Sequence, residues 1–401
     1  MKVVFKKIKV IVLIVIISLT FIPYSSFAEK IYIDITQPGI KKLSIALEGF
    51  EGISKVSNTI KEELEFTEYF KIFGPFPYRD EKFDPLLWKS TDVEIVIRAL
   101  IFGKIEVKVY TVTSESPIFI KQYPLQDNEY TGKLIASDIY RLLTGKNSPF
   151  FNRFAFVRKF KNSMGIFISN WNGKQIQDTA IRREIISRVV LKDNKIFYSS
   201  LQNRFWHIEV FDIFNKSNKE IIKSRNLLKL GDVSNQNQII YLESDGELSQ
   251  IKISDLSGKN KTLSSSRWID ASPRFAPSHI FLVSNRIGSP QIYQMSYDGL
   301  FIRRLTYQNR YNTEPAVSPD GNKIAFSSLS AGFQINVLDL NSNIQTQITK
   351  DGNNEQPSFC PDGHFLTIMS DRFGKKEIFL ISSDGAVQKS LTNGYLPYCS
   401  R

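Results

Sequence analysis

Short apolar stretches recur at a nearly constant interval through the last two-thirds of the chain. They are rich in Ile, Phe, Tyr and Val, residues that favour strands, and each is shorter than a typical helix. Successive copies begin 41 to 44 residues apart, and they occupy residues 154–160, 195–200, 238–244, 279–284, 323–328 and 365–370. A repeat of this length that holds four short strands is typical of a β-propeller blade.

The last three copies share further landmarks. A proline opens the strand before each copy, and these prolines, Pro273, Pro315 and Pro357, are 42 residues apart in both steps. A third strand then ends in a polar turn, and a fourth ends in Leu-Thr or Ile-Thr. Together with the three earlier copies, these landmarks predict an all-β six-bladed propeller of WD40-like repeats over residues 149–401.

Turn residues separate the predicted strands. Ser318–Gly321 reads Ser-Pro-Asp-Gly, which has the proline and glycine positions of a type I turn. Asp298-Gly299 and Asp384-Gly385 are hairpin signals. We therefore interpret Asp320 and Asp362 as turn residues and predict no catalytic residues among them.

The chain ends with the beginning of a further repeat. Pro397 follows Pro357 by 40 residues, whereas the copy at 154–160 has no proline-led strand before it. We expect residues 396–401 to supply this missing first strand and so close the ring without an exposed sheet edge. Cys399 would then be buried in an inner strand.

Residues 29–148 lack the repeat and predict a separate α+β domain. A helix running into a strand is expected over 57–73, a short helix near Trp88, and an amphipathic helix over 130–145 that ends at Gly145. The other expected strands fall within residues 30–35, 41–50, 93–102, 104–113 and 117–125.

The N-terminus has the three regions of a secretory signal peptide. A basic segment precedes the apolar stretch Val10–Ile22, and Ser26 and Ala28 are small residues placed for cleavage before Glu29. The apolar stretch is shorter than the ~20 residues that a membrane span requires, and Pro23 interrupts it. We therefore expect residues 1–28 to be removed and an exported chain without a membrane span.

Composition narrows the function classes. The chain is 42% hydrophobic and 23% charged with a net charge of +12, but it has no block of five or six like charges. We expect a globular protein that does not bind nucleic acid. The three histidines are scattered singly, so we predict no metal and no cofactor. Cys360 and Cys399 could form a disulfide or be ordinary core residues, and the sequence leaves both possibilities open.

Three segments resemble the TolB family, the periplasmic components of the Tol–Pal system. Residues 86–100 are similar to its N-terminal domain, residues 143–157 to its domain junction, and the Pro-Asp-Gly repeats to its blades. The resemblance implies a non-enzymatic periplasmic adaptor that supports outer-membrane integrity and cell division. It also implies two partners, the lipoprotein Pal and a TolA-like inner-membrane protein. We expect the chain to be a monomer.

The resemblance also implies where Pal binds. The family contacts Pal through residues just before the first-strand prolines, which here are Ala271, Ser272, Thr313, Glu314, Glu355 and Gln356. We add Arg286 and Arg372, because in a propeller the loops between second and third strands share a face with the loops that enter the first strands. The polar loops expected on this face are 266–272, 285–290, 308–314, 351–356 and 371–376. We expect all of these residues to be exposed.

The first mature residues would contact the TolA-like partner. The candidates are Glu29, Lys30, Ile31, Ile33 and Ile35. The alternating isoleucines could add an edge strand to a partner, or they could form an internal strand of their own domain.

Two other function classes compete with an adaptor. A propeller peptidase needs a Gly-x-Ser-x-Gly motif, which the sequence lacks. A propeller lyase needs a metal or His cluster in its channel, and the three singly scattered histidines argue against one. A generic exported scaffold that binds glycan remains the second alternative, and a partner-binding experiment would distinguish it.

Overall fold

The computed structural model describes residues 41–79 and 82–400. The expected signal peptide and the candidate segment Glu29–Ile35 lie outside the described residues.

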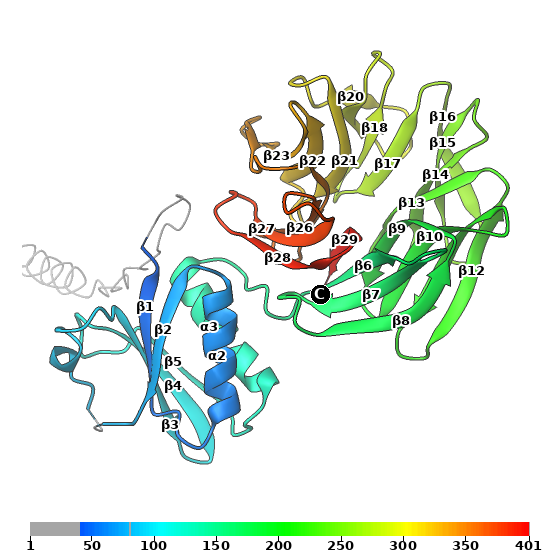
Figure 1. Ribbon diagram of the computed structural model, residues 1–401. Helices are drawn as coiled ribbons and strands as arrows, with labels where there is room; N and C mark the ends of the chain where they lie inside the picture. The colour runs from blue at the N-terminus through cyan, green and yellow to red at the C-terminus, as the bar shows by residue number, and fades with distance from the viewer. Residues whose placement is uncertain (1–40, 80–81, 401) are drawn as a thin grey trace, which may run out of the picture. The chain divides into compact units, whose positions relative to one another are not determined.

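An α+β region comes first in the described chain (Figure 1). Its five-stranded sheet has the order β2-β1-β3-β4-β5, in which β1 is parallel to both neighbours and the remaining pairs are antiparallel. The strands are β1 (Leu43–Glu48), β2 (Phe70–Phe76), β3 (Ile95–Ile101), β4 (Lys104–Thr111) and β5 (Phe119–Pro124).

Two helices, α2 (Ser54–Phe66) and α3 (Glu129–Thr144), pack against each other beside this sheet. The Asn128 side chain accepts the first-turn N–H of Thr131 at 2.8 Å, and Gly145 ends α3 with a φ of +69°. The short helix expected near Trp88 is the 3-10 turn Pro85–Leu87. The predicted α+β elements within the described residues are confirmed.

Six four-stranded sheets follow and form the propeller, which confirms the predicted fold class. The sequence copies at 154–160 and onward are the second strand of every blade. From the inner to the outer strand, blade 1 consists of β29 (Tyr395–Ser400), β6 (Arg153–Lys159), β7 (Met164–Asn170) and β8 (Ile176–Arg183). Blade 2 consists of β9 (Ile185–Lys192), β10 (Lys195–Gln202), β11 (Phe205–Asp212) and β12 (Ser217–Ser224). Blade 3 consists of β13 (Leu227–Val233), β14 (Ile239–Ser244), β15 (Ser249–Ser254) and β16 (Asn260–Ser266).

Blades 4 to 6 have the same order. Blade 4 consists of β17 (Asp270–Phe275), β18 (Ile280–Ser284), β19 (Gln291–Met295) and β20 (Ile302–Arg304). Blade 5 consists of β21 (Tyr311–Val317), β22 (Lys323–Leu329), β23 (Phe333–Asp339) and β24 (Gln345–Gln347). Blade 6 consists of β25 (Asn354–Phe359), β26 (Phe365–Ser370), β27 (Glu377–Ser382) and β28 (Gln388–Asn393). The hydrophobic core lies between neighbouring blades: Ala325 and Ile335 of blade 5, for example, pack with Leu366 and Ile368 of blade 6.

The ring closes as the sequence predicts. The C-terminal strand β29 pairs antiparallel with β6, so that Cys399 lies opposite Phe154, and Figure 1 shows β29 in red beside β6 in green. Cys399 is buried and forms a disulfide with Cys360, which follows the inner strand of blade 6. The last strand, β29, is therefore joined to blade 6 by the disulfide as well as to β6 of its own blade 1.

The two kinds of predicted turn adopt one arrangement. In Ser318–Gly321, Ser296–Gly299 and Ser382–Gly385, the glycine N–H donates to the serine carbonyl at 2.8 to 3.0 Å. The serine hydroxyl in each turn donates to the aspartate carboxylate. These aspartates are thus turn residues, and Asp298-Gly299 and Asp384-Gly385 lie in four-residue turns of the Ser-x-Asp-Gly type.

Candidate partner-binding face and channel of the propeller

The loop face is formed by the loops that enter the first strands and the loops that join second to third strands. Asn353 N–H donates to Asp371 at 2.7 Å, and Ile269 N–H donates to the Asn285 side chain at 2.7 Å. Each bond joins one loop of each kind, so the two sets of loops share a face as expected.

The residues before the first-strand prolines are less exposed than expected. Ser272, Glu314 and Gln356 have φ values of +50°, +54° and +59°, and each lies at a bulge in the inner strand of its blade. Ser272 is buried, and the side chains of Glu314 and Gln356 are half-buried. The neighbouring candidates Ala271, Thr313 and Glu355 are also half-buried.

These bulges connect neighbouring blades. Glu314 Oε2 accepts the backbone N–H of Gln356 at 2.9 Å and the Ser327 hydroxyl at 3.1 Å. Gln356 Oε1 in turn accepts the N–H of Leu396 in β29 at 2.8 Å. The expectation that Glu314 and Gln356 are exposed was wrong, because their side chains accept backbone N–H groups at the bulges of the next blades.

Arg286 and Arg372 also hold the loop face together. Arg286 forms an ion pair with buried Asp270 at 3.1 Å and lies 5.0 Å from the Tyr293 ring centre. Arg372 donates to Asn354 at 2.7 Å and lies 4.4 Å from the Phe379 ring centre. Both guanidinium groups are half-buried. Through these contacts they fix the conformation of the loops on this face.

Exposed apolar side chains also lie on this face, and none of them is among the Pal-binding residues predicted from the sequence. Trp268 is 53% exposed and Phe373 is 69% exposed, and Ile269, Ile287 and Tyr307 are at least half exposed. All five belong to loop-face loops of blades 4 to 6. Large apolar residues inside loops rich in Ser, Asn, Arg and Gly were the available sequence signal. Several exposed apolar side chains on one face, among polar neighbours, are typical of a protein-binding surface.

A basic pocket borders the same face between blades 6 and 1. It measures about 500 Å³ and is lined mainly by Arg158, Lys159, Lys375 and Lys376, with Tyr395 at the start of β29. The pocket therefore favours acidic groups on a partner.

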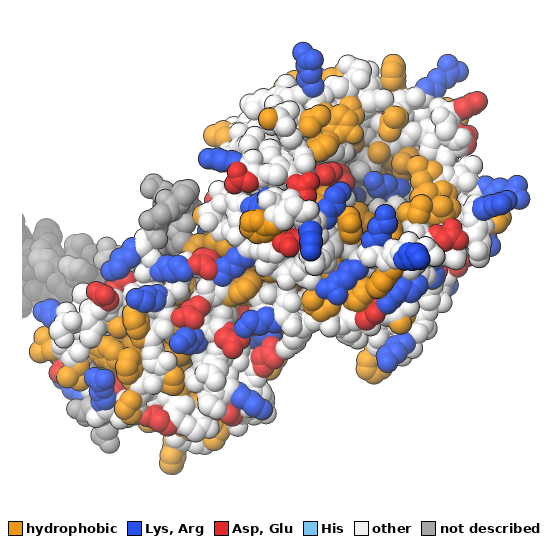
Figure 2. Space-filling model, viewed as in Figure 1, with side chains coloured by type: hydrophobic (Ala, Val, Ile, Leu, Met, Phe, Trp, Pro, Cys, Tyr) orange, Lys and Arg blue, Asp and Glu red, His pale blue; other side chains and the backbone are white. Residues whose placement is uncertain are grey.

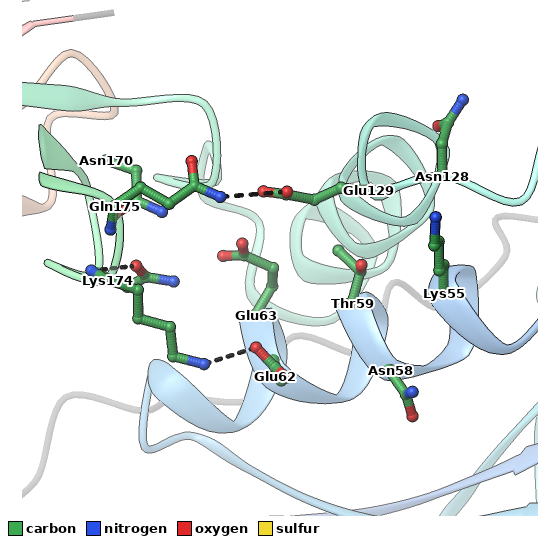
Figure 3. A pocket seen from close by; sticks show the side chains of 11 residues that line it. Lys55, Asn58, Thr59, Glu62, Glu63, Asn128, Glu129, Asn170, Lys174 and Gln175 are labelled. Atoms are coloured by element: carbon green, nitrogen blue, oxygen red, sulfur yellow. Dashed lines mark hydrogen bonds and ion pairs between the residues drawn. The ribbon is translucent and has the colours of Figure 1, made fainter. Parts of the chain in front are cut away.

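A second pocket, about 370 Å³, is lined by α2, by the N-terminal end of α3 and by the loop after β7. In Figure 3, Glu63 of α2 points toward this loop, and Glu62 and Glu129 pair with Lys174 and Gln175. The Glu63 carboxylate accepts the indole N–H of buried Trp171 and lies 3.6 Å from Lys133 Nζ. Burial raises the pKa of Glu63 to about 7, because desolvation outweighs the attraction of Lys133 and the Trp171 hydrogen bond.

This raised pKa predicts a loss of stability as pH rises. Below pH 4.5 Glu63 is protonated in both states, whereas between pH 4.5 and about 7 the unfolded chain has released the proton and the folded chain still retains it. We expect wild type to lose on the order of 3 kcal/mol between pH 4.5 and 8 relative to Glu63→Gln. Urea unfolding followed by Trp fluorescence at pH 5 and pH 8 measures this difference. Glu62→Gln, at an exposed ion pair, should keep the wild-type pH dependence; the same dependence in Glu63→Gln would refute the assignment.

No helix within residues 41–79 and 82–400 is long and apolar enough to cross a membrane. Across these ranges, no group of three or more His, Cys, Asp or Glu side chains is placed to hold a metal ion.

The fold and the loop face define a class of protein: a six-bladed β-propeller preceded by an α+β region. The family described as TolB beta propeller domain matches residues 140–395. The chain therefore belongs to this family.

Curated relatives match over shorter segments. A protein TolB homolog of Chlorobium chlorochromatii is 32% identical over 117 residues, which are 29% of this chain and 26% of the relative. A Tol-Pal system protein TolB of Desulfosudis oleivorans is 30% identical over 128 residues, 32% of this chain and 29% of the relative. The matches thus span less than a third of these relatives.

A solved structure matches over nearly the whole fold. TolB from Acinetobacter baumannii superposes with a TM-score of 0.82 at 20% identity, covering 91% of this chain and 98% of that one. At this identity the likeness establishes the fold alone.

Proposed function

We propose that this chain is a non-enzymatic periplasmic adaptor of a Tol–Pal envelope system, supporting outer-membrane integrity and cell division. The Tol-Pal name carried by the Desulfosudis relative supports the system, and the signal peptide expected over residues 1–28 supports export. The proposal includes a domain boundary near residue 148, between the end of α3 and the start of β6.

The loop face binds a Pal-type lipoprotein in this proposal. The observation that carries it is the group of exposed apolar side chains that includes Trp268, Tyr307 and Phe373, set among ordered arginines and next to a basic pocket. Aromatic side chains of this kind dominate binding energy at protein interfaces. The TolA-like partner would bind the segment Glu29–Ile35.

A titration of residues 29–401 against the soluble domain of Pal from the same organism tests the proposal. We expect saturable binding with a Kd in the micromolar range or tighter. The variant Trp268→Ala/Tyr307→Ala should weaken it by about tenfold or more, because two aromatic anchors are lost. Charge reversal at Glu314 is a poorer test, since this half-buried carboxylate also stabilises the bulge of blade 6.

Leu300→Ala is the matched control. Leu300 is 87% exposed but belongs to the loop joining the third and fourth strands of blade 4, away from the loop face. Absence of binding by the folded wild type, or equal weakening by the control, would reject this face as the Pal site.

A further inference from the structure

Three basic side chains meet in the central channel of the propeller. Arg188, Lys229 and Arg274 lie on the inner strands β9, β13 and β17 of consecutive blades, and β13 contacts both of the other two strands. Burial lowers the pKa of Lys229 and brings that of Arg274 to about 9, and repulsion from the neighbouring cations adds to the effect of burial at both residues. Figure 2 shows Lys and Arg side chains inside the hollow at the centre of the propeller.

Two of these cations are buried with unsatisfied donors. Arg188 and Arg274 are each 5% exposed, and the Nε of each lacks a hydrogen-bond partner among the described residues. Arg274 Nη1 donates to the carbonyls of Gly231 and Pro273 at 2.7 and 3.0 Å, and the Arg188 guanidinium lies 5.4 Å from the Tyr398 ring centre. A buried guanidinium N–H without an acceptor is costly, so the two Nε atoms favour an acceptor bound beside them.

The nearby carboxylates are already engaged by other donors. Asp232 accepts the Tyr398 hydroxyl and the Phe275 N–H, both at 3.1 Å. Glu314 accepts Gln356 N–H and the Ser327 hydroxyl. Asp232 also attracts Lys192, so the cations around these two carboxylates outnumber them.

A cavity of about 590 Å³ lies beside this cluster; the three basic residues do not line it, but Asp232 and Tyr398, whose charges or dipoles act on Arg188 and Arg274, do. Asn235, Gln236 and Tyr297 line it as well. It is formed largely by the turns between first and second strands, and so it opens at the end of the channel away from the loop face. Its polar wall would admit a polar ligand of small cross-section.

We propose that the channel binds a carboxylate group, held by Arg188, Lys229 and Arg274. An anion matches this excess of positive charge, and Asp232 and Glu314 would repel a monoanion less than a phosphate dianion. A guanidinium also presents paired N–H donors that fit a carboxylate. The group could come from an acidic side chain of a peptide or from a free organic acid. This site is separate from the proposed Pal face.

Calorimetric titration at fixed ionic strength tests the proposal with two probes, sodium acetate and a blocked peptide with a single Glu. We expect saturable binding of at least one probe, weakened tenfold or more by Arg188→Gln and by Lys229→Gln. Arg303→Gln, an exposed arginine on the outer strand β20, is the charge-matched control and should bind as wild type does. Binding of the peptide alone identifies a tethered carboxylate, and binding of both identifies the group itself.

Two results would overturn the proposal. One is absence of saturable binding of either probe to the folded wild type. The other is equal binding in wild type, Arg188→Gln and Lys229→Gln. Thermal unfolding of each variant without a probe separates these results from misfolding, because removing a buried unpaired charge should leave the Tm unchanged or higher.

Discussion

A chain that ends at Gly394 is expected to lose cooperative unfolding of the propeller. The deletion removes β29, which is the first strand of blade 1 and pairs with β6. It also removes Cys399 and its disulfide, and it leaves Gln356 without the Leu396 N–H. The exposed edge of β6 and the opened core between blades 1, 2 and 6 should together exceed the ~5–15 kcal/mol by which domains are stable.

Urea unfolding followed by circular dichroism and Trp fluorescence measures the effect. Removal of Arg401 alone is the control and should leave the transition in place, because it ends the chain just after β29. A synthetic peptide of residues 395–401 added to the truncated chain should restore part of the transition. An unchanged midpoint in the truncated chain would show that closure by the last strand is not what stabilises the ring.

The ring and its closure could be predicted because their signals are local and periodic. Each first-strand proline and each Ser-x-Asp-Gly turn depends on residues a few positions apart, and the phase of Pro397 shows that the tail begins a repeat. The α+β elements were predictable for a similar reason, since Asn128 and Gly145 mark both ends of α3 within one short segment.

The details of the candidate site depend on contacts between blades, which no local pattern encodes. Glu314 reads as a loop residue, yet a bulge turns it toward the N–H of Gln356 in the next blade. The channel cluster is harder still to foresee. Arg188, Lys229 and Arg274 lie about 40 residues apart, and the first two belong to repeats that lack the proline and turn landmarks. Only the closed ring brings them together.

The disulfide shows the same contrast between what a local pattern predicts and what contacts between blades decide. The sequence placed Cys399 in an inner strand but left its pairing open, because Cys360 belongs to the previous repeat, 39 residues away. Closure puts these two strands side by side: Cys399 N–H donates to Ser358 Oγ at 3.1 Å. The bond therefore fastens the last strand to blade 6 while β6 holds it to blade 1.

Removing this disulfide is expected to lower the free energy of unfolding by about 3 to 4 kcal/mol, the range for a loop of this length when the cross-link restricts the unfolded chain. Cys360→Ala/Cys399→Ala is the suitable variant. Both sulfurs are buried, and serine would add the separate cost of two buried hydroxyls. The urea midpoint of the oxidised wild type, compared with that of the double variant, measures the change.

Two comparisons decide whether the bond acts through closure of the ring. Wild type unfolded under a reducing agent should match the double variant, since both lack the cross-link. The double variant should also show faster amide exchange in β29 than in β25, because a terminal strand held on one side by a sulfur bridge frays when the bridge is removed. Equal exchange in both strands would mean that hydrogen bonds to β6 and Ser358 hold β29 without the disulfide, and its contribution would then lie in the unfolded chain alone.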